Sequence, residues 1–282
     1  MTTDENVIRL DDVTVSFGEQ AILRGITFDV ARGSTVAIIG ESGCGKSVTL
    51  KTIVGLILPN RGSVSVNGSD VAKLSESQRI AMRLKVGFLF QGAALFDSMN
   101  VGDNVAFGLR AQRRLDEKQI RERVEERVRE VGLSESVLEK MPAELSGGMR
   151  KRVGLARALA LDPDVMLYDE PTTGLDPLMS DVINDLILQT RRKRPLTSIV
   201  VSHDMKTVMK VADRVVMFYP LSRLSPTDPQ VIYDGPPSGL STSEDVRVRS
   251  FVEGDAHIGE TSTGESKSGS GSHRLSGTQP KV

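Results

Sequence analysis

A glycine-rich segment near the start of the chain has the residues needed to hold a chain of phosphates. Residues 40–49 read GESGCGKSVT, in which Gly40, Gly45, Lys46 and Ser47 fit the P-loop pattern G-x-x-x-x-G-K-[ST]. Glycines let the backbone turn tightly around a nucleotide, and the lysine neutralises phosphate charge. We expect contacts along the whole loop, from Gly40, Glu41, Ser42, Gly43, Cys44, Gly45, Lys46, Ser47 and Val48. The loop alone does not separate kinases, GTPases, motors and transporters.

Two carboxylates at the end of an apolar stretch could complete a site for phosphoryl transfer. Residues 165–170 read VMLYDE, the form of a Walker B strand. Asp169 could hold Mg²⁺ through water beside Ser47, and Glu170 could polarise an attacking water. The alternative is a pair of solvated carboxylates at a strand end, which the presence of the P-loop disfavours.

Apolar stretches and turn signals predict the elements that position these groups. Helices are expected at residues 46–58, ended by a turn at 59–62, at 115–133, and after residue 149. Strands are expected at residues 7–15, 26–30, 34–40, 62–68, 164–170 and 198–204. Strands that alternate with helices predict a largely parallel sheet, with ligand chemistry at the carboxyl ends of its strands.

The predicted helix 115–133 has an apolar stripe and many charges. Ile120, Val124, Val128 and Val131 recur at helical spacing. We interpret the charges on its other faces as a solvated surface.

Composition excludes several classes of function. The 282 residues are 39% hydrophobic and carry a formal net charge of −1, so no overall basic field favours nucleic acid. Cys44 is the single cysteine, which rules out an internal disulfide framework and fits a reducing cytosol. The N-terminus does not resemble a signal peptide, and no apolar run approaches the roughly 18 residues of a membrane helix. If the protein serves a membrane, other chains must cross it.

The end of the chain differs in composition from the rest. Residues 254–282 contain 6 Gly, 6 Ser and 3 Thr and few large aliphatic residues. Such a segment cannot bury enough apolar surface to offset its ordering entropy. We therefore expect one domain at residues 1–253 and a disordered tail at 254–282.

A further motif makes the chain similar to a known family. LSGGM at residues 145–149, ahead of a helix and some twenty residues before the Walker B strand, resembles the signature of the ATP-binding cassette (ABC) family. In order, Gln91 resembles the family's Q-loop residue, GLD at 174–176 its D-loop, and His203 its switch histidine. Phe17 stands where the family usually has an aromatic residue that stacks on adenine.

The resemblance implies a fold, cofactors and a set of site residues. It implies an α/β P-loop NTPase core with an N-terminal antiparallel β subdomain and an inserted helical subdomain at about residues 92–160. Two chains would sandwich two ATP molecules with Mg²⁺. Glu170, His203 and Gln91 would be catalytic, and Ser47, Gln91 and Asp169 would serve the metal. The remaining nucleotide contacts would come from Phe17 and, across the dimer, from Ser146, Gly147, Gly148 and Asp176.

The segment after Gln91 and the end of the ordered region resemble one subfamily. GAALFDSMNVGDNVAFGLR at 92–110, together with LSGGM and VRSF at 248–251, is similar to the ATPase of the Mla/Mce lipid-transport systems. This resemblance implies phospholipid transport at the cytoplasmic face of the inner membrane, with a separate permease and an Mce-domain partner. It also allows a small regulatory subunit. Within segment 92–110, the apolar residues could instead simply pack the helical subdomain.

Two other functions share some of these motifs. An importer of polar solutes such as amino acids has every catalytic motif, and segment 92–110 and the VRSF end argue against it. ABC proteins of DNA repair or translation usually carry coiled coils or two cassettes in one chain, and this chain has neither. Residues 220–235 form a longer, more Pro-rich connection than is usual in the family, and the sequence predicts no function for them.

Overall fold

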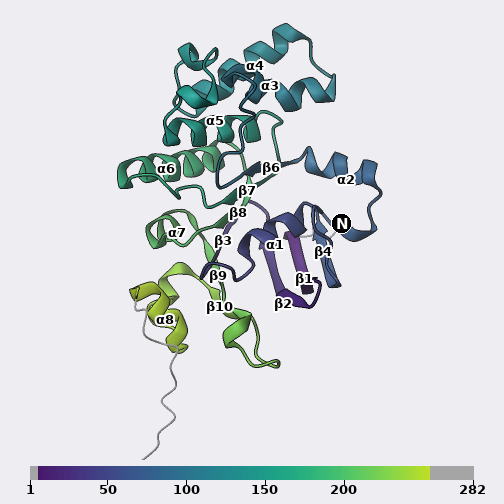
Figure 1. Ribbon diagram of the computed structural model, residues 1–282, viewed down its shortest axis with the longest axis vertical. Helices are drawn as coiled ribbons and strands as arrows, with labels where there is room; N and C mark the ends of the chain where they lie inside the picture. Colours follow the sequence, from purple (N-terminus) through teal and green to yellow (C-terminus); the bar gives the residue numbers. More distant parts are fainter. Residues whose placement is uncertain (1–5, 255–282) are drawn as a thin grey trace, which may run out of the picture.

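The computed structural model describes residues 6–254, which form two sheets and surrounding helices (Figure 1). The first sheet is antiparallel and has the strand order β2-β1-β4-β5. Its strands are β1 (Asn6–Phe17), β2 (Gln20–Ala31), β4 (Arg61–Val66) and β5 (Ser69–Asp70). Because β2 lies at an edge of this sheet, one side of its backbone is free to pair with other segments.

The second sheet carries the motifs and has the order β10-β9-β3-β8-β7-β6. Its strands are β3 (Thr35–Gly40), β6 (Val86–Leu89), β7 (Val165–Asp169), β8 (Thr197–Val201), β9 (Arg214–Phe218) and β10 (Val231–Gly235). All neighbours are parallel except β10 and β9. Strands β3, β7 and β8 are buried along their whole length, as expected for parallel strands covered on both faces. The predicted largely parallel sheet is confirmed.

Helices cover this sheet, and α3, α4 and α5 gather at one end of the molecule (Figure 1). The α-helices are α1 (Lys46–Ile53), α2 (Glu76–Arg83), α3 (Val101–Gln112), α4 (Glu117–Glu130), α5 (Gly147–Leu159), α6 (Pro177–Lys193), α7 (Met205–Val211) and α8 (Val246–Glu253). Short 3₁₀ turns occur at Val71–Lys73, Glu135–Val137, Pro142–Glu144, Leu221–Arg223 and Pro237–Gly239. Within residues 6–254, no helix combines the length and the apolar character needed to cross a bilayer.

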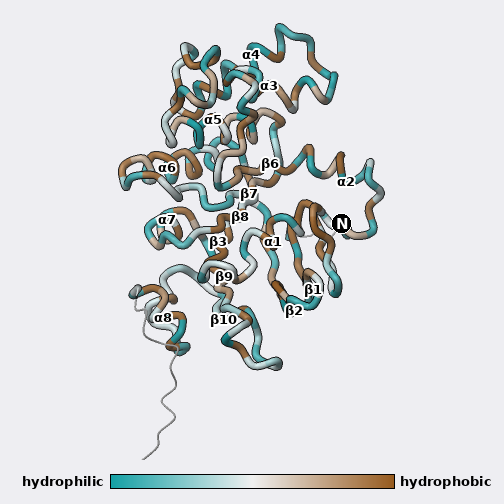
Figure 2. Tube along the Cα trace, in the orientation of Figure 1, coloured by the Kyte–Doolittle hydropathy of each residue, from teal (hydrophilic) through white to brown (hydrophobic). Residues whose placement is uncertain are grey.

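The hydrophobic core follows the central strands (Figure 2). One cluster of buried residues joins α3, α4 and α5 to β6 and β7, and another joins the antiparallel sheet to α1 and β3. The P-loop, between β3 and α1, therefore lies against the second cluster, to which Cys44 belongs. The tail predicted at 254–282 lies outside the described residues, apart from Gly254, which follows α8 with a positive φ.

Helix α1 is shorter than the sequence predicts. It ends at Ile53, whereas the apolar run continues to Leu58. Gly55 has a φ of 65°, and the amide of Leu56 donates to the carbonyl of Lys51, so the chain leaves the helix in a glycine-dependent C-cap. The prediction of a helix to residue 58 was wrong because the apolar pattern outweighed this internal glycine.

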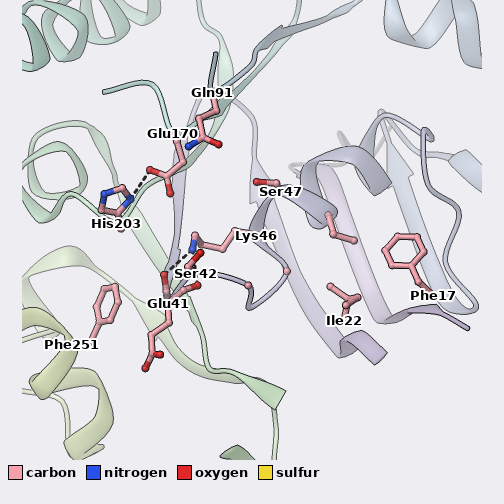
Figure 3. Close-up of a pocket in the computed structure, with 14 residues that line it drawn as sticks. Phe17, Ile22, Glu41, Ser42, Lys46, Ser47, Gln91, Glu170, His203 and Phe251 are labelled. Atoms are coloured by element: carbon pink, nitrogen blue, oxygen red, sulfur yellow. Dashed lines mark hydrogen bonds and ion pairs between the residues drawn. The ribbon is translucent and has the colours of Figure 1, made fainter. Parts of the chain in front are cut away.

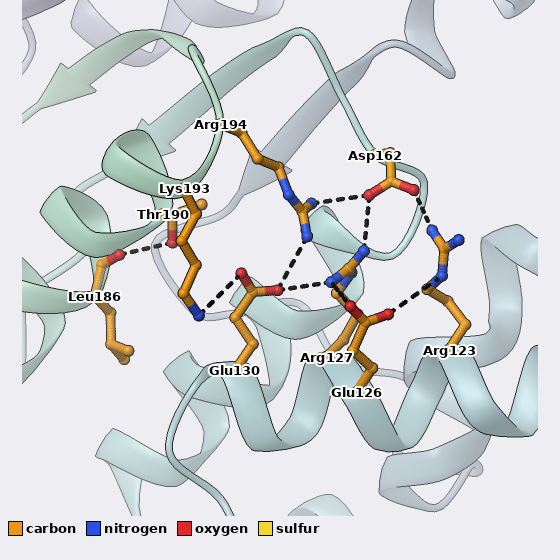
Figure 4. Close-up of polar contacts among 9 residues, drawn as sticks. All are labelled: Arg123, Glu126, Arg127, Glu130, Asp162, Leu186, Thr190, Lys193 and Arg194. Atoms are coloured by element: carbon orange, nitrogen blue, oxygen red, sulfur yellow. Dashed lines mark hydrogen bonds and ion pairs between the residues drawn. The ribbon is translucent and has the colours of Figure 1, made fainter.

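Not all charges of α4 form a solvated face, which corrects the interpretation from sequence (Figure 4). The side chain of Arg127 is only 3% exposed, and its guanidinium contacts Glu130 and Asp162 at 2.8 Å each. Arg194, at the end of α6, contacts the same two carboxylates at 3.2 and 2.9 Å. This network ties α4 to the chain before β7 and to α6. The spacing within α4 could not reveal partners so distant in sequence.

Candidate nucleotide site

One cavity of about 630 Å³ lies between the two sheets and contains most of the predicted site (Figure 3). Its volume is typical of small-molecule sites. It is lined by Phe17, Ile22, Gly40, Glu41, Ser42, Gly43, Gly45, Lys46, Ser47, Val48, Gln91, Glu170, His203 and Phe251. The cavity thus brings together the P-loop, Gln91, Glu170 after β7 and His203 after β8, which are far apart in the sequence.

The P-loop requires glycine where it meets its neighbours. Gly40 has a φ of 141°, and a Cβ there would lie 2.3 Å from the carbonyl oxygen of Phe218. Gly45 has a φ of 96°, and a Cβ there would lie 2.4 Å from Leu23. Lys46, only 8% exposed, donates from Nζ to the carbonyl oxygens of Gly40 and Glu41 at 2.8 Å each. The ammonium group is therefore held within the curve of the loop, where phosphate charge would be neutralised.

Cys44 belongs to this loop, but its side chain does not line the cavity. It is 2% exposed and packs in the core beneath the loop. Burial raises the pKa of the Cys44 thiol, and the charge of Lys46 opposes that rise. Any contact from Cys44 to a nucleotide would therefore come from its backbone.

Cys44 should consequently react slowly with maleimide in the folded protein. A raised pKa leaves little thiolate near neutral pH, and burial blocks access, so we expect labelling at least about tenfold slower than in urea. The rate should rise with pH as thiolate forms. Labelling followed by mass spectrometry measures this, with the urea-unfolded protein as control. Equal rates in both states would show that the thiol is accessible.

Ser47 lines the cavity, and Asp169, just outside its wall, completes a pair suited to a metal ion. The hydroxyl of Ser47 donates to Asp169 Oδ1 at 2.8 Å. Burial raises the pKa of Asp169, and the bond from Ser47 opposes this. A hydroxyl and a carboxylate at the edge of a phosphate cradle fit Mg²⁺, which prefers oxygen ligands and binds few protein groups directly. Mg²⁺ bound there would neutralise charge on the phosphates.

Glu170 and His203 lie side by side in the cavity wall and contact each other (Figure 3). His203 Nδ1 lies 2.8 Å from Glu170 Oε2, and the hydroxyl of Thr173 donates to the same oxygen at 2.9 Å. The φ of Glu170 is 50°, a left-handed value that is rare for glutamate. Such an outlier persists only where its surroundings impose it. The carboxylate of Glu170 is held by two partners and faces the cavity.

Lys151 is a residue of this region that sequence reasoning missed. It lies in α5, is 5% exposed, and donates from Nζ to the carbonyl oxygens of Gln91 and, at 2.9 Å, Glu170. Burial lowers the pKa of Lys151 to about 8, although the charges of Glu170 and Asp169 act in the opposite direction. It joins α5 to the Q-loop and to the residue after β7. Its place in a run of basic residues gave no signal of burial.

Comparisons with known proteins agree with this geometry. Residues 23–173, more than half of the chain, match the family model described as ABC transporter. This chain belongs to the ABC transporter family. The ABC family's activity, ATP binding and hydrolysis, is therefore also that of this chain.

Three related proteins illustrate the range of similarity. The intermembrane phospholipid transport system ATP-binding protein MlaF of Haemophilus influenzae is 39% identical over 253 residues, covering 90% of this chain and 92% of that protein. The probable ribonucleotide transport ATP-binding protein mkl of Mycobacterium leprae is 38% identical over 260 residues, covering 92% and 72%. A dimeric ATP-binding cassette in a post-hydrolysis state with ADP and Pi has a TM-score of 0.72 and 29% identity, covering 82% and 98%.

The ABC signature residues lie apart from the cavity in the single chain. Ser146 caps α5, and its side chain accepts a bond from the amide of Met149. Gly147 and Gly148 begin that helix, and none of the three lines the cavity. Asp176 caps α6 in the same way and is also absent from the cavity wall. These four predicted contacts are therefore not brought to the P-loop of their own chain.

Three apolar residues line the cavity of this ABC chain beyond the P-loop. The sequence predicted one of them, Phe17, and did not predict the other two. Phe17 is 54% exposed and lines the cavity, as a ring that stacks on a base would. Ile22 of β2 and Phe251 of α8 line it as well. Phe251 belongs to the VRSF segment, which the sequence distinguished only as a subfamily marker. The sequence therefore singled out the segment that contains Phe251 but did not indicate that it lies at the cavity.

Proposed function

We propose that this chain is the ATP-hydrolysing subunit of a transporter that moves phospholipid. For hydrolysis, the supporting observation is one cavity that joins the P-loop to Glu170 and His203, with Asp169 bonded to Ser47 of its wall. For the substrate, the support is the 39% identity to the phospholipid transport protein of H. influenzae over 92% of that protein's length.

The residues around the cavity have separate roles in binding and hydrolysing ATP. Lys46 and the loop amides bind the phosphates, and Phe17 stacks on the base. Ser47 and Asp169, with Gln91, hold Mg²⁺. Glu170 accepts the proton of the attacking water, and His203 bonds the γ-phosphate. The contact between Glu170 and His203 keeps both side chains at the same part of the cavity wall.

The working form is a homodimer with two composite sites. Ser146, Gly147 and Gly148 begin α5, where backbone amides and the helix dipole attract phosphate. Because they do not line their own chain's cavity, we assign them, with Asp176, to the nucleotide of the partner subunit. The post-hydrolysis cassette to which the chain is similar is itself a dimer.

The transporter also needs chains that cross the membrane. We place the ATPase dimer on the cytoplasmic face of the inner membrane, bound to a permease and, further out, to an Mce-domain partner. A partner of this kind would shield acyl chains from water, since each exposed CH₂ costs about 0.8 kcal/mol.

A second candidate substrate is a ribonucleotide, because the mkl protein, with 38% identity, is described as a probable ribonucleotide transporter component. Purifying the complex from its native membrane and identifying bound small molecules by mass spectrometry distinguishes the two. We expect co-purified phospholipid and an ATPase stimulated by it. A complex without lipid, stimulated by ribonucleotides, would favour the second candidate.

Two exposed rings are suited to contact the permease. Phe96 and Phe107 are 40% and 45% exposed, with ring centroids 4.6 Å apart. Arg157 lies over the ring of Phe96 at 5.7 Å. By contrast, Leu95 packs against the core around α3 to α5, and Val105 is fully buried. Segment 92–110 thus contains both packing residues and an exposed pair.

Replacing Phe96 and Phe107 by alanine should uncouple ATP hydrolysis from transport. Exposed aromatic residues often dominate an interface, so we expect transport per ATP to fall by about fivefold or more while ATP binding is unchanged. Parallel assays of turnover and transport in the reconstituted complex measure the ratio. Ile80→Ala, an exposed apolar residue on α2, is the control. Normal coupling in the double variant would exclude this pair from the permease contact.

A further inference from the structure

The long connection between β9 and β10 contacts both β2 and the P-loop beside the nucleotide cavity. We call residues 219–230 the strap. Its last residue, Gln230, is 1% exposed although it is polar. Its main-chain oxygen accepts a bond from the amide of Tyr219 at 2.9 Å, which closes the strap at its base. A buried carboxamide requires partners for all its polar atoms.

Gln230 finds two of those partners on the free edge of β2. Its Oε1 accepts a bond from the amide of Arg24 at 2.8 Å, and its Nε2 donates to the carbonyl oxygen of Ile22 at 3.1 Å. The carboxamide thus pairs with β2 as a peptide group of a neighbouring strand would. It covers part of an edge that would otherwise be unpaired.

The third partner of Gln230 lies in the P-loop. Nε2 also donates to the carbonyl oxygen of Cys44 at 3.0 Å. Two carbonyl acceptors and one amide donor fix the orientation of the side chain, because only the amino group can serve both carbonyls. One side chain therefore fastens the phosphate loop to β2.

This link joins the two sides of the nucleotide cavity. Ile22, with Phe17, lines the side formed by the antiparallel sheet, and the P-loop forms the phosphate side. We propose that Gln230 is a positioning residue for nucleotide binding, which sets the spacing between the base-stacking wall and the phosphate loop. The inference rests on the proposed binding of ATP in this cavity.

The rest of the strap supports Gln230 but contributes less. The guanidinium of Arg24 donates to the carbonyl oxygens of Ser225 and Asp228 at 2.8 and 3.0 Å. Arg223 pairs with Glu41 of the P-loop at 2.6 Å, with side chains 48% and 38% exposed. Exposed ion pairs contribute little, whereas a buried amide with three bonds leaves three groups unsatisfied when it is removed. We therefore assign the positioning role to Gln230.

The test compares two ligands that share phosphates but not the base. In the purified complex of Gln230→Ala, the KM for ATP should rise roughly tenfold, while kcat stays within about twofold of wild type. The inhibition constant of inorganic triphosphate with Mg²⁺ should change less than about twofold, because this ligand does not span the two sides. General weakening of the P-loop would raise both constants together.

Three variants make the comparison specific. Gln230→Glu keeps the size of the side chain but places an oxygen against the carbonyls of Ile22 and Cys44. It should therefore raise the KM for ATP more than the inhibition constant of triphosphate, even if the alanine variant unfolds. Arg223→Ala should change the KM for ATP less than about twofold. Gln189→Ala, at an exposed position of α6, should have no effect.

The outcomes separate this inference from the proposed function. Equal loss of ATP and triphosphate binding, or an unchanged KM for ATP in both Gln230 variants, would overturn the positioning role. A wild-type complex that does not hydrolyse ATP would overturn the proposed function instead. An ATP-specific loss that spares kcat supports the inference.

Discussion

The Glu170→Gln protein should bind MgATP with nearly wild-type affinity and hydrolyse it at least about a hundredfold more slowly, in the range that general-base residues contribute. Glutamine keeps the size of the side chain and its bond from Thr173, but it cannot accept the proton of the attacking water. The dimer should therefore accumulate closed around unhydrolysed ATP. Single-turnover hydrolysis and nucleotide-binding titrations on the same preparation measure the two effects separately.

The matched control for this substitution is Glu122→Gln, at an exposed position of α4. It removes one negative charge without touching the cavity and should leave turnover unchanged. Near-normal turnover by Glu170→Gln would remove Glu170 from the role of base. A large loss of ATP affinity instead would mean that Glu170 mainly shapes the cavity.

Lys46→Ala should act on binding. Lys46 carries a positive charge at the phosphate loop and also bonds the carbonyl oxygens of Gly40 and Glu41. Removing a buried cation that faces phosphate should weaken ATP binding by roughly a hundredfold, since charged hydrogen bonds are worth about 1.5–3 kcal/mol each. Isothermal titration with ATP measures the change. Lys118→Ala, exposed on α4, is the control, and unchanged affinity in Lys46→Ala would place the phosphates elsewhere.

Residues at the ends of parallel strands could be predicted well. Gly40 ends β3, Asp169 ends β7, and His203 follows β8. Strand β8 lies between β3 and β7, so the carboxyl ends of all three meet at one edge. The sequence combined buried strands with motifs at their ends, and this was enough to predict that Asp169 lies beside Ser47.

Contacts made by side chains across long sequence separations could not be predicted. Gln230 and Cys44 are 186 positions apart, and nothing in the local sequence of either indicates a partner. Lys151 and Arg127 resemble surface charges in their helices, yet both are buried by elements distant in sequence. The end of α1 was missed for a different reason, since Gly55 stands within an apolar run that continues past the helix.

ATP-driven transfer of phospholipid is the central claim, and reconstitution tests it most directly. The complete complex in donor vesicles is supplied with a fluorescent phospholipid and acceptor vesicles, and transfer is followed with and without ATP. We predict transfer that requires ATP and is lost in the complex containing Glu170→Gln. ATP-driven accumulation of a ribonucleotide or an amino acid by the same complex, with no movement of phospholipid, would contradict the account.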